Sequence, residues 1–308
     1  MSKTIFIVLS CTFTLAVILL VTFLGLRTGP QSKFHIKSDQ NIVLFAVTPW
    51  GDPRQVKDAY QPLLQYLSEK TGKKFQLLIM EDYDAALENI IDGNIDIFFI
   101  SPVPYVKAKQ REPGIQYIAT ILRDQGGHMA ATFKGYLIAL KSKYAGMTID
   151  DFLKSPDKYH FAFVTKASAS GYAYPMAMMK KRGIDPYKVF KNVSIFENHP
   201  AMVDALVAGK IDLGATWEYS LEKAREQYGD IFTILYTTHD IPAMSWVASK
   251  KVEKALVERI RQVLLELNDL TELKEKLLKD TPDKGWTVLD QSHYDQVSEV
   301  LKYVGDFK

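Results

Sequence analysis

The sequence of 308 residues contains a single cysteine, Cys11, and no long run of lysine or arginine. One cysteine excludes an intrachain disulfide framework and a zinc site built from several cysteines. A net charge of +2 gives no basic footprint of the kind that nucleic-acid-binding proteins carry. We therefore expect no nucleic-acid partner. The hydrophobic fraction of 47% is that of an ordinary folded protein.

Short motifs of common catalytic and nucleotide-binding sites are also absent. The sequence has no Gly-x-Gly-x-x-Gly, no phosphate loop with Gly-Lys-Ser/Thr, no His-Glu-x-x-His and no Gly-x-Ser-x-Gly. The histidines show no metal-ligand spacing. A hydrolase built from Ser170, His199 and Asp240 can be drawn, but no nucleophile-elbow pattern supports it. We therefore expect no enzymatic activity, no cofactor and no metal.

An apolar segment lies near the start of the chain. Residues 5–26 carry no charge and are flanked by Lys3 and Arg27. This length can span a bilayer and exceeds the apolar region of a usual signal peptide. We predict a signal anchor or transmembrane helix in residues 1–27 and a polar tether in residues 28–40. Counting the flanking lysines and arginines would place the rest of the chain in the cytoplasm.

Two blocks with the same order of predicted elements follow the tether. Each runs strand, turn, helix, strand, helix and strand, and the second block lies about 116 residues after the first. The clearest match pairs Gly-Asn-Ile-Asp at 93–96 with Gly-Lys-Ile-Asp at 209–212. The repeat predicts an α/β fold with two similar lobes, each with a sheet rich in parallel strands.

The predicted elements also suggest where each lobe begins and ends. We assign residues 41–135 and 243–308 to lobe 1, and residues 136–242 to lobe 2. The chain then passes between the lobes twice, which implies a hinge and closure around a ligand.

A serine-rich stretch lies between a predicted strand and a predicted helix in lobe 2. Residues 165–172 read Thr-Lys-Ala-Ser-Ala-Ser-Gly-Tyr. Hydroxyls and free backbone N–H groups at a helix N-terminus favour an anion. Serine is also the commonest simple helix cap, so the residues alone leave both interpretations open.

Further candidates follow the carboxyl ends of the predicted parallel strands, where open sheets bind ligands. His199 can donate a hydrogen bond to an anionic oxygen or serve as a cap or surface residue. Glu218 can balance a proton or an ammonium group of a ligand, or favour a helix N-terminus. Aromatic side chains can line the site or belong to the core, and the candidates of this kind are Trp50, Tyr83 and Tyr136.

From residue 41 to about residue 300, the chain resembles the phosphate-, phosphite- and phosphonate-binding proteins of ABC importers. The resemblance rests on Ser-Ala-Ser-Gly-Tyr at 168–172 with Pro175, on Gly-Ile-Asp-Pro at 183–186, and on His199 with the segment 205–212. It implies a type II periplasmic-binding-protein fold. It also implies a location at the periplasmic or extracytoplasmic face of the inner membrane, with ABC permease subunits as partners. Together with the apolar segment, we expect a monomer anchored there by residues 5–26.

The resemblance assigns roles to the candidate residues. The serine-rich motif would hold the phosphoryl oxygens of the ligand through Ser168, Ala169, Ser170 and Gly171. Phenolic and imidazole donors would complete the cage from Tyr83, Tyr136 and His199. Ala169 stands where the family typically has threonine, so one hydroxyl is missing.

A second departure concerns the ligand's substituent. Members that bind aminoalkylphosphonates have an acid after Ile-Pro of the returning strand, where this chain has Ala243 and Met244. Glu218 represents the family's other acid only approximately. The expected ligand is therefore phosphate, phosphite or a small alkylphosphonate, rather than 2-aminoethylphosphonate. Two alternatives remain open at this stage, a ligand-sensing input protein for a membrane signalling system and a phosphoester-processing enzyme.

Overall fold

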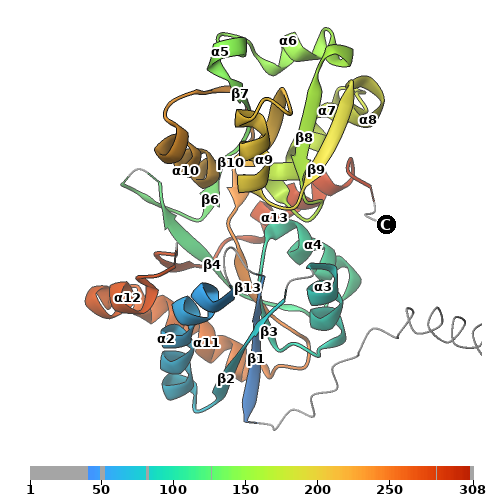
Figure 1. Cartoon of the computed structure of the whole chain (residues 1–308). Helices are drawn as coiled ribbons and strands as arrows, with labels where there is room; N and C mark the ends of the chain where they lie inside the picture. Colours follow the sequence, from blue (N-terminus) through green and yellow to red (C-terminus); the bar gives the residue numbers. More distant parts are fainter. Residues whose placement is uncertain (1–40, 49–52, 81–82, 126, 282, 306–308) are drawn as a thin grey trace, which may run out of the picture. The chain divides into compact units, whose positions relative to one another are not determined.

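The computed structural model describes residues 41–48, 53–80, 83–125, 127–281 and 283–305, which belong to one compact unit (Figure 1). The predicted anchor in residues 1–27 and the predicted tether in residues 28–40 lie outside the described residues. Within the described ranges, no helix has both the length and the apolar character that crossing a bilayer requires.

The first sheet contains seven of the described strands, in the order β14–β4–β13–β3–β1–β2 with β5 beside β4. β1, β2 and β3 are parallel, whereas β13 runs antiparallel to both of its neighbours, β3 and β4. The bounds are β1 (Ile42–Val47), β2 (Lys74–Ile79), β3 (Ile97–Ile100), β4 (Gln116–Asp124), β5 (Met129–Ala130), β13 (Ser245–Ala248) and β14 (Gly285–Thr287).

The second sheet contains five described strands in the order β11–β7–β10–β8–β9. β8, β9 and β10 are parallel, and β7 runs antiparallel to β10 and β11. The bounds are β7 (Gly135–Leu140), β8 (His160–Val164), β9 (Asn192–Phe196), β10 (Leu213–Trp217) and β11 (Phe232–Thr237).

The two sheets share one strand order, which agrees with the internal repeat in the sequence. Read from the edge, β2–β1–β3–β13–β4 of the first sheet corresponds to β9–β8–β10–β7–β11 of the second. Both sheets are mixed, so the expectation of parallel-rich sheets is correct only for three neighbouring strands in each. The reversed strands, β13 and β7, come after the segments that connect the sheets. The chain therefore enters each of these strands at the end of the sheet where the parallel strands finish.

The segments that connect the sheets pair with each other. β6 (Thr132–Phe133) and β12 (Ile241–Pro242) form a separate two-stranded antiparallel ribbon. The predicted lobe boundaries lie next to this ribbon, and β7 begins at Gly135, one residue before the predicted start of lobe 2. The division into lobes itself stays a prediction.

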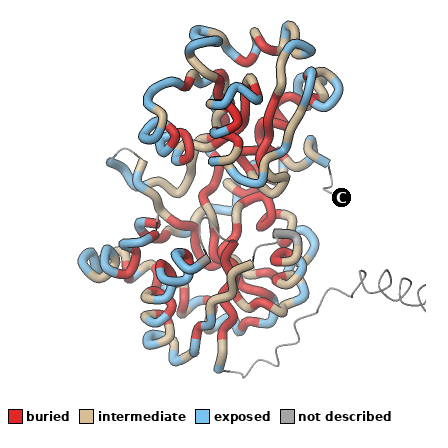
Figure 2. The backbone as a smooth tube through the Cα atoms, viewed as in Figure 1, coloured by how far each residue is buried: buried red, intermediate tan, exposed pale blue. Residues whose placement is uncertain are grey.

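Alternation along the strands explains why helices cover both faces of each sheet. In the first sheet, Val43 and Phe45 face the core shared with helices α2 (Pro53–Thr71) and α11 (Lys254–Leu267). Ala46 faces the core shared with α4 (Pro102–Arg111) and α13 (Gln291–Leu301). In the second sheet, Leu137 faces α7 (Tyr174–Lys181) and Ile138 faces α9 (His199–Val207). Figure 2 shows buried backbone along both sheets.

Helices in the described chain vary from single turns to long amphipathic segments. Their bounds are α2 (Pro53–Thr71), α3 (Tyr83–Asp92), α4 (Pro102–Arg111), α5 (Lys141–Tyr144), α6 (Ile149–Leu153), α7 (Tyr174–Lys181), α8 (Pro186–Val189), α9 (His199–Val207), α10 (Glu218–Tyr228), α11 (Lys254–Leu267), α12 (Thr271–Leu278) and α13 (Gln291–Leu301). A 3-10 turn, η1 (Pro156–Lys158), and a π-helical turn, η2 (Ala169–Ala173), complete them.

The repeated Gly-x-Ile-Asp segments have the same structural role in both sheets. Gly93 and Gly209 each have a φ of 70°, the left-handed conformation with which glycine ends a helix. Asp96 then accepts a hydrogen bond from the backbone N–H of Leu44 at 2.8 Å, and Asp212 accepts one from that of His160 at 2.9 Å. Each aspartate thus fixes the third strand of its block to the first.

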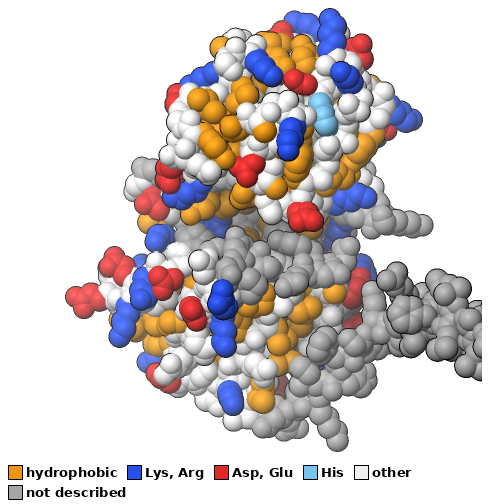
Figure 3. Space-filling view, in the orientation of Figure 1, with side chains coloured by type: hydrophobic (Ala, Val, Ile, Leu, Met, Phe, Trp, Pro, Cys, Tyr) orange, Lys and Arg blue, Asp and Glu red, His pale blue; other side chains and the backbone are white. Residues whose placement is uncertain are grey.

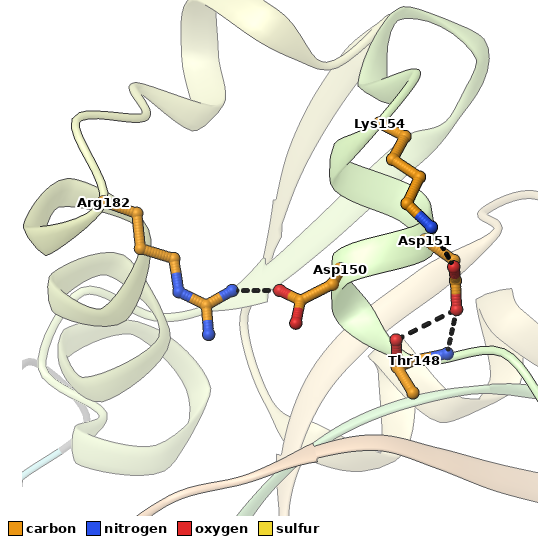
Figure 4. A network of polar contacts seen from close by, with 5 residues as sticks. All are labelled: Thr148, Asp150, Asp151, Lys154 and Arg182. Atoms are coloured by element: carbon orange, nitrogen blue, oxygen red, sulfur yellow. Dashed lines mark hydrogen bonds and ion pairs between the residues drawn. The ribbon is translucent and has the colours of Figure 1, made fainter.

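A network of polar contacts surrounds helix α6, in the part of the chain that contains the second sheet (Figure 4). Thr148 and Asp151 form a capping box, and Lys154 contacts the Asp151 carboxylate at 2.7 Å. The hydrogen bond from Lys154, followed by those from Thr148, lowers the pKa of Asp151 to about 2. Asp150 pairs with Arg182 at the end of α7. Such exposed pairs orient the short helix but contribute little stability.

Candidate functional site

Ser168 caps a π-helical turn at the carboxyl end of strand β8. Its Oγ atom accepts a hydrogen bond from the backbone N–H of Gly171 at 2.9 Å, and the turn continues directly into α7. The cap interpretation is therefore correct for the structure as described. A hydroxyl that accepts one hydrogen bond can still donate its own proton, so capping leaves Ser168 able to bind an anion.

Gly171 occupies a position where only glycine fits. A Cβ atom there would lie 2.7 Å from Cβ of Val164, 2.9 Å from Oγ of Ser168 and 3.1 Å from Cε1 of His199. The absence of a side chain lets the turn lie against the strand and the imidazole at once. The glycine of the motif is thus explained by packing between three elements.

His199 begins helix α9 beside the serine cap. Its Nε2 atom lies 3.4 Å from Oγ of Ser168, and its Nδ1 atom lies 3.2 Å from Oγ1 of Thr216 in β10. The residue keeps some exposed surface, but protein surrounds its imidazole, and this burial lowers the pKa of His199 to about 4. The ring is therefore neutral at pH 7, with one nitrogen that donates and one that accepts.

Tyr136 and Glu218 lie near each other on the same side of the second sheet. Tyr136 in β7 is the cross-strand partner of Thr216, so the side chains of Tyr136 and Thr216 lie on the same face of the sheet. Thr216 in turn contacts His199. Burial first, and then the negative charge of Glu218, raise the pKa of Tyr136. The Oε2 atom of Glu218 is buried and has no hydrogen-bond partner among the described residues.

Ala169 and Ser170 are mainly packing residues in this structure. Ala169 is buried in the core that also contains residues of the first sheet. Ser170 is 4% exposed and lies against Gly135, where a Cβ atom would come within 3.0 Å of the serine Cβ.

Not all of the candidates from the first sheet can be placed. Trp50 lies outside the described residues. Tyr83 is the first residue of α3, and its side chain also lies outside the description. Ser101, which follows β3, donates from its hydroxyl to the carbonyl oxygen of Ala167 at 3.5 Å. This long contact brings the end of β3 next to the residue that precedes the Ser168 cap.

Two residues near the site carried no signal in the sequence. Thr216 contacts His199, and Arg123 of β4 lies over the ring of Trp217 at 4.9 Å from its centroid. Trp217 also contacts the His199 ring, with 6.3 Å between centroids, and packs against Phe133 of β6. These contacts join segments that are far apart in the chain, and no local pattern reports them.

Basic and acidic side chains are interspersed on the face that Figure 3 shows. Among the described residues, no group of three or more histidine, cysteine, aspartate and glutamate side chains is arranged to hold a metal ion.

Comparison with known proteins gives consistent results for the sequence and the fold. The profile of a family described as "ABC transporter, phosphonate, periplasmic substrate-binding protein" matches residues 45–294. A curated relative, the phosphate-import protein PhnD of Mycolicibacterium smegmatis, is 23% identical over 297 residues, which is 91% of this chain and 90% of that protein.

Two solved structures share the fold. One is a binding-protein component of an ABC phosphonate transporter from Pseudomonas aeruginosa, with 18% identity, a TM-score of 0.71, and coverage of 85% of this chain and 86% of that one. The other is PhnD1 from Prochlorococcus marinus in complex with methylphosphonate, with 18% identity, a TM-score of 0.70, and coverage of 84% and 97%.

The profile match extends over most of the chain, from β1 into α13, and it includes every site residue described above. The resemblance drawn from the sequence motifs is thereby confirmed, and the mixed-sheet α/β fold is similar to that of the solved relatives. The chain belongs to the family of periplasmic substrate-binding proteins of phosphonate ABC transporters.

Proposed function

We propose that this chain is a solute-binding protein that captures a phosphorus oxyanion and delivers it to an ABC importer. The proposal depends mainly on the contact between Ser168 and His199, which lies beside Gly171 at the carboxyl end of a parallel strand. Membership of the family supports the transport role, and the names of the relatives support phosphate or phosphonate as the ligand class.

The chemistry of the site suits an oxyanion held by neutral donors. The Ser168–His199 contact of 3.4 Å is long for a hydrogen bond, so both groups can turn toward a ligand oxygen at little cost. The N-terminal end of the turn and of α7 adds backbone N–H groups and the positive end of the peptide dipoles. A neutral imidazole donates one hydrogen bond and keeps its other nitrogen for Thr216.

Within this class, we propose phosphate, phosphite or a small alkylphosphonate. An ammonium substituent needs acidic partners, and Ala243, which is buried, stands where aminoalkylphosphonate-binding members have an acid. The single candidate acid is Glu218, whose free Oε2 atom can accept a hydrogen bond from a proton of the ligand. Tighter binding of 2-aminoethylphosphonate than of methylphosphonate in calorimetry would contradict this preference.

The remaining parts of the proposal concern fold class and location. We assign the chain to the type II periplasmic-binding-protein fold, with a hinge at the β6–β12 ribbon. We place it as a monomer at the extracytoplasmic face of the inner membrane, held by residues 5–26. Permease subunits would be its partners, and we propose no catalytic role.

A thermal-shift panel on residues 33–308 tests the proposal. Phosphate, phosphite, methylphosphonate, 2-aminoethylphosphonate and sulfate are added singly. A ligand at 100 times its dissociation constant stabilises the folded state by about 2.7 kcal/mol, which is readily seen. We expect a response to at least one of the first three compounds. No response to any phosphorus oxyanion would contradict the transport role.

A further inference from the structure

We propose that Arg123 is a further ligand-binding residue, a cation that the first sheet contributes to the oxyanion held at Ser168 and His199. This inference rests on the proposed function. Arg123 would add a charged group from the first sheet to the proposed site. A ligand held by both sheets would then link binding directly to the approach of the two sheets.

The first step is the position of Arg123. It is the last but one residue of β4, at the same edge of the first sheet as the carboxyl ends of the parallel strands. Its guanidinium carbon lies 4.9 Å from the centroid of the Trp217 ring, and Trp217 in turn contacts the ring of His199. Arg123 and His199 therefore contact the same indole ring, that of Trp217, which places Arg123 close to the proposed oxyanion site.

The second step is that the guanidinium has unused donors. Its Nε atom is buried and has no hydrogen-bond partner among the described residues, and the side chain as a whole is 16% exposed. Arg123 forms an ion pair with Asp283, whose Oδ1 atom lies 3.7 Å from an Nη atom, a distance too long for a direct hydrogen bond. An incompletely paired buried cation is costly, and an anionic ligand would offset that cost.

Asp283 and Trp217 hold the guanidinium in place. Asp283 is 1% exposed, and its Oδ2 atom accepts a long hydrogen bond from the hydroxyl of Tyr60 at 3.4 Å. Burial raises the pKa of Asp283, and the positive charge of Arg123 opposes that rise. Trp217 supports the planar group through its ring face, an arrangement that suits arginine better than lysine.

The donors that the second sheet contributes to the proposed site carry no formal positive charge. The donors assembled from the second sheet are a serine hydroxyl, backbone N–H groups and a neutral imidazole. A guanidinium can add two parallel hydrogen bonds to an oxyanion. Lys166 lies two residues before Ser168 and is the competing cation. Arg123 is favoured over it because Arg123 is linked to His199 through Trp217.

The test measures the dissociation constant for methylphosphonate and for phosphate by calorimetry, with the ligand-free melting temperature of each variant. Arg123→Gln should weaken binding by about 10- to 100-fold, since a hydrogen bond to a charged group is lost. Arg123→Lys, which keeps the charge but loses the fork of donors, should lie between this variant and the wild type. Lys166→Gln is the matched control and should change affinity by less than about threefold.

Because Arg123→Gln leaves Asp283 without its cation, the double variant Arg123→Gln/Asp283→Asn separates structure from binding. We expect it to melt close to the wild type and still bind as weakly as Arg123→Gln. Wild-type affinity in the double variant would overturn the proposal and make Arg123 a structural partner of Asp283. A larger loss in Lys166→Gln than in Arg123→Gln would also overturn it. If the wild-type chain binds neither compound, the proposed function fails as well. If the wild type binds and the Arg123→Gln variant binds equally well, only the proposed role of Arg123 fails.

Discussion

The Nε2 atom of His199 lies 3.4 Å from the Oγ atom of Ser168, although the two residues are 31 positions apart in the chain. Ser168 ends the loop after β8, and His199 begins the helix after β9. Since β8 and β9 are parallel neighbours, their carboxyl ends lie at one edge of the sheet and bring the two side chains together. The strand order of the second sheet thus creates the candidate site.

Replacing Ser168 by alanine should weaken both the fold and the ligand complex. Loss of the hydrogen bond from Gly171 should cost about 1 kcal/mol of unfolding free energy, and loss of the hydroxyl donor should weaken oxyanion binding roughly tenfold. Urea unfolding and calorimetry measure the two effects. Ser194→Ala is the matched control, because Ser194 also pairs with a histidine, His160, at 2.8 Å but outside the site. Equal ligand affinities of the two variants would argue against a role for the Ser168 hydroxyl.

Gly171→Ala should be destabilising because its Cβ atom would lie 2.7 Å from Cβ of Val164. Forcing an extra carbon atom into a packed site costs about 1–3 kcal/mol. The double variant Gly171→Ala/Val164→Gly removes the Cβ atom that clashes, so Gly171→Ala should cost less in the Val164→Gly background than in the wild type. Denaturant midpoints of the four proteins form a double-mutant cycle. A cycle without coupling would show that the close packing around Gly171 is not as described.

The pKa of His199 predicts a pH dependence of stability. Burial lowers this pKa from 6.5 to about 4, so the unfolded chain binds a proton at His199 more readily than the folded chain does. The stabilisation by neutral His199 is therefore complete above about pH 6.5, declines as the pH falls and is lost near pH 4. It amounts to about 1–3 kcal/mol, allowing for the exposed part of the residue.

The matched variant for this prediction is His199→Gln, which cannot titrate. Urea unfolding of both proteins at pH 7.5 and pH 5 gives the difference in stability at each pH. The wild type should lose more stability than the variant between the two values. Equal losses would mean that the imidazole is hydrated in the folded protein.

The repeated aspartates should differ in importance. Asp212 accepts hydrogen bonds from the N–H of His160 and from the hydroxyl of Tyr144 at 2.6 Å, whereas Asp96 accepts one from the N–H of Leu44. Each change to asparagine should cost about 1–3 kcal/mol, with the larger loss for Asp212→Asn. Chemical denaturation measures both. A larger loss for Asp96→Asn would contradict this ranking by the number of accepted hydrogen bonds.

The sequence was sufficient to predict the parts of the fold that depend on local pattern and repetition. The two Gly-x-Ile-Asp segments revealed the repeated strand order, and the apolar runs located the parallel strands. The direction of β7 and β13 was not predictable in this way, because an apolar run shows burial but not orientation. The serine-rich stretch lies between β8 and α7, as the pattern predicts, and Ser168 forms a cap there. Anion binding by the same residues stays a prediction.

The rest of the candidate site depends on contacts that no short window contains. Thr216 looks like any strand residue until the strand order places it beside His199. Arg123 and Trp217 are 94 positions apart, and their stacking depends on how the ends of β4 and β10 approach each other. Ala169 was predicted from a motif to contribute its backbone N–H to the ligand; its side chain is buried in the core, and its role in binding stays a prediction.

Calorimetric titration of residues 33–308 with phosphate, phosphite and methylphosphonate, repeated for His199→Gln and Ser168→Ala, tests the central claim most directly. The account predicts saturable one-to-one binding of at least one of these anions by the wild type, and binding roughly tenfold weaker in each variant. Absence of binding by a folded wild type, or unchanged affinity in both variants, would contradict it.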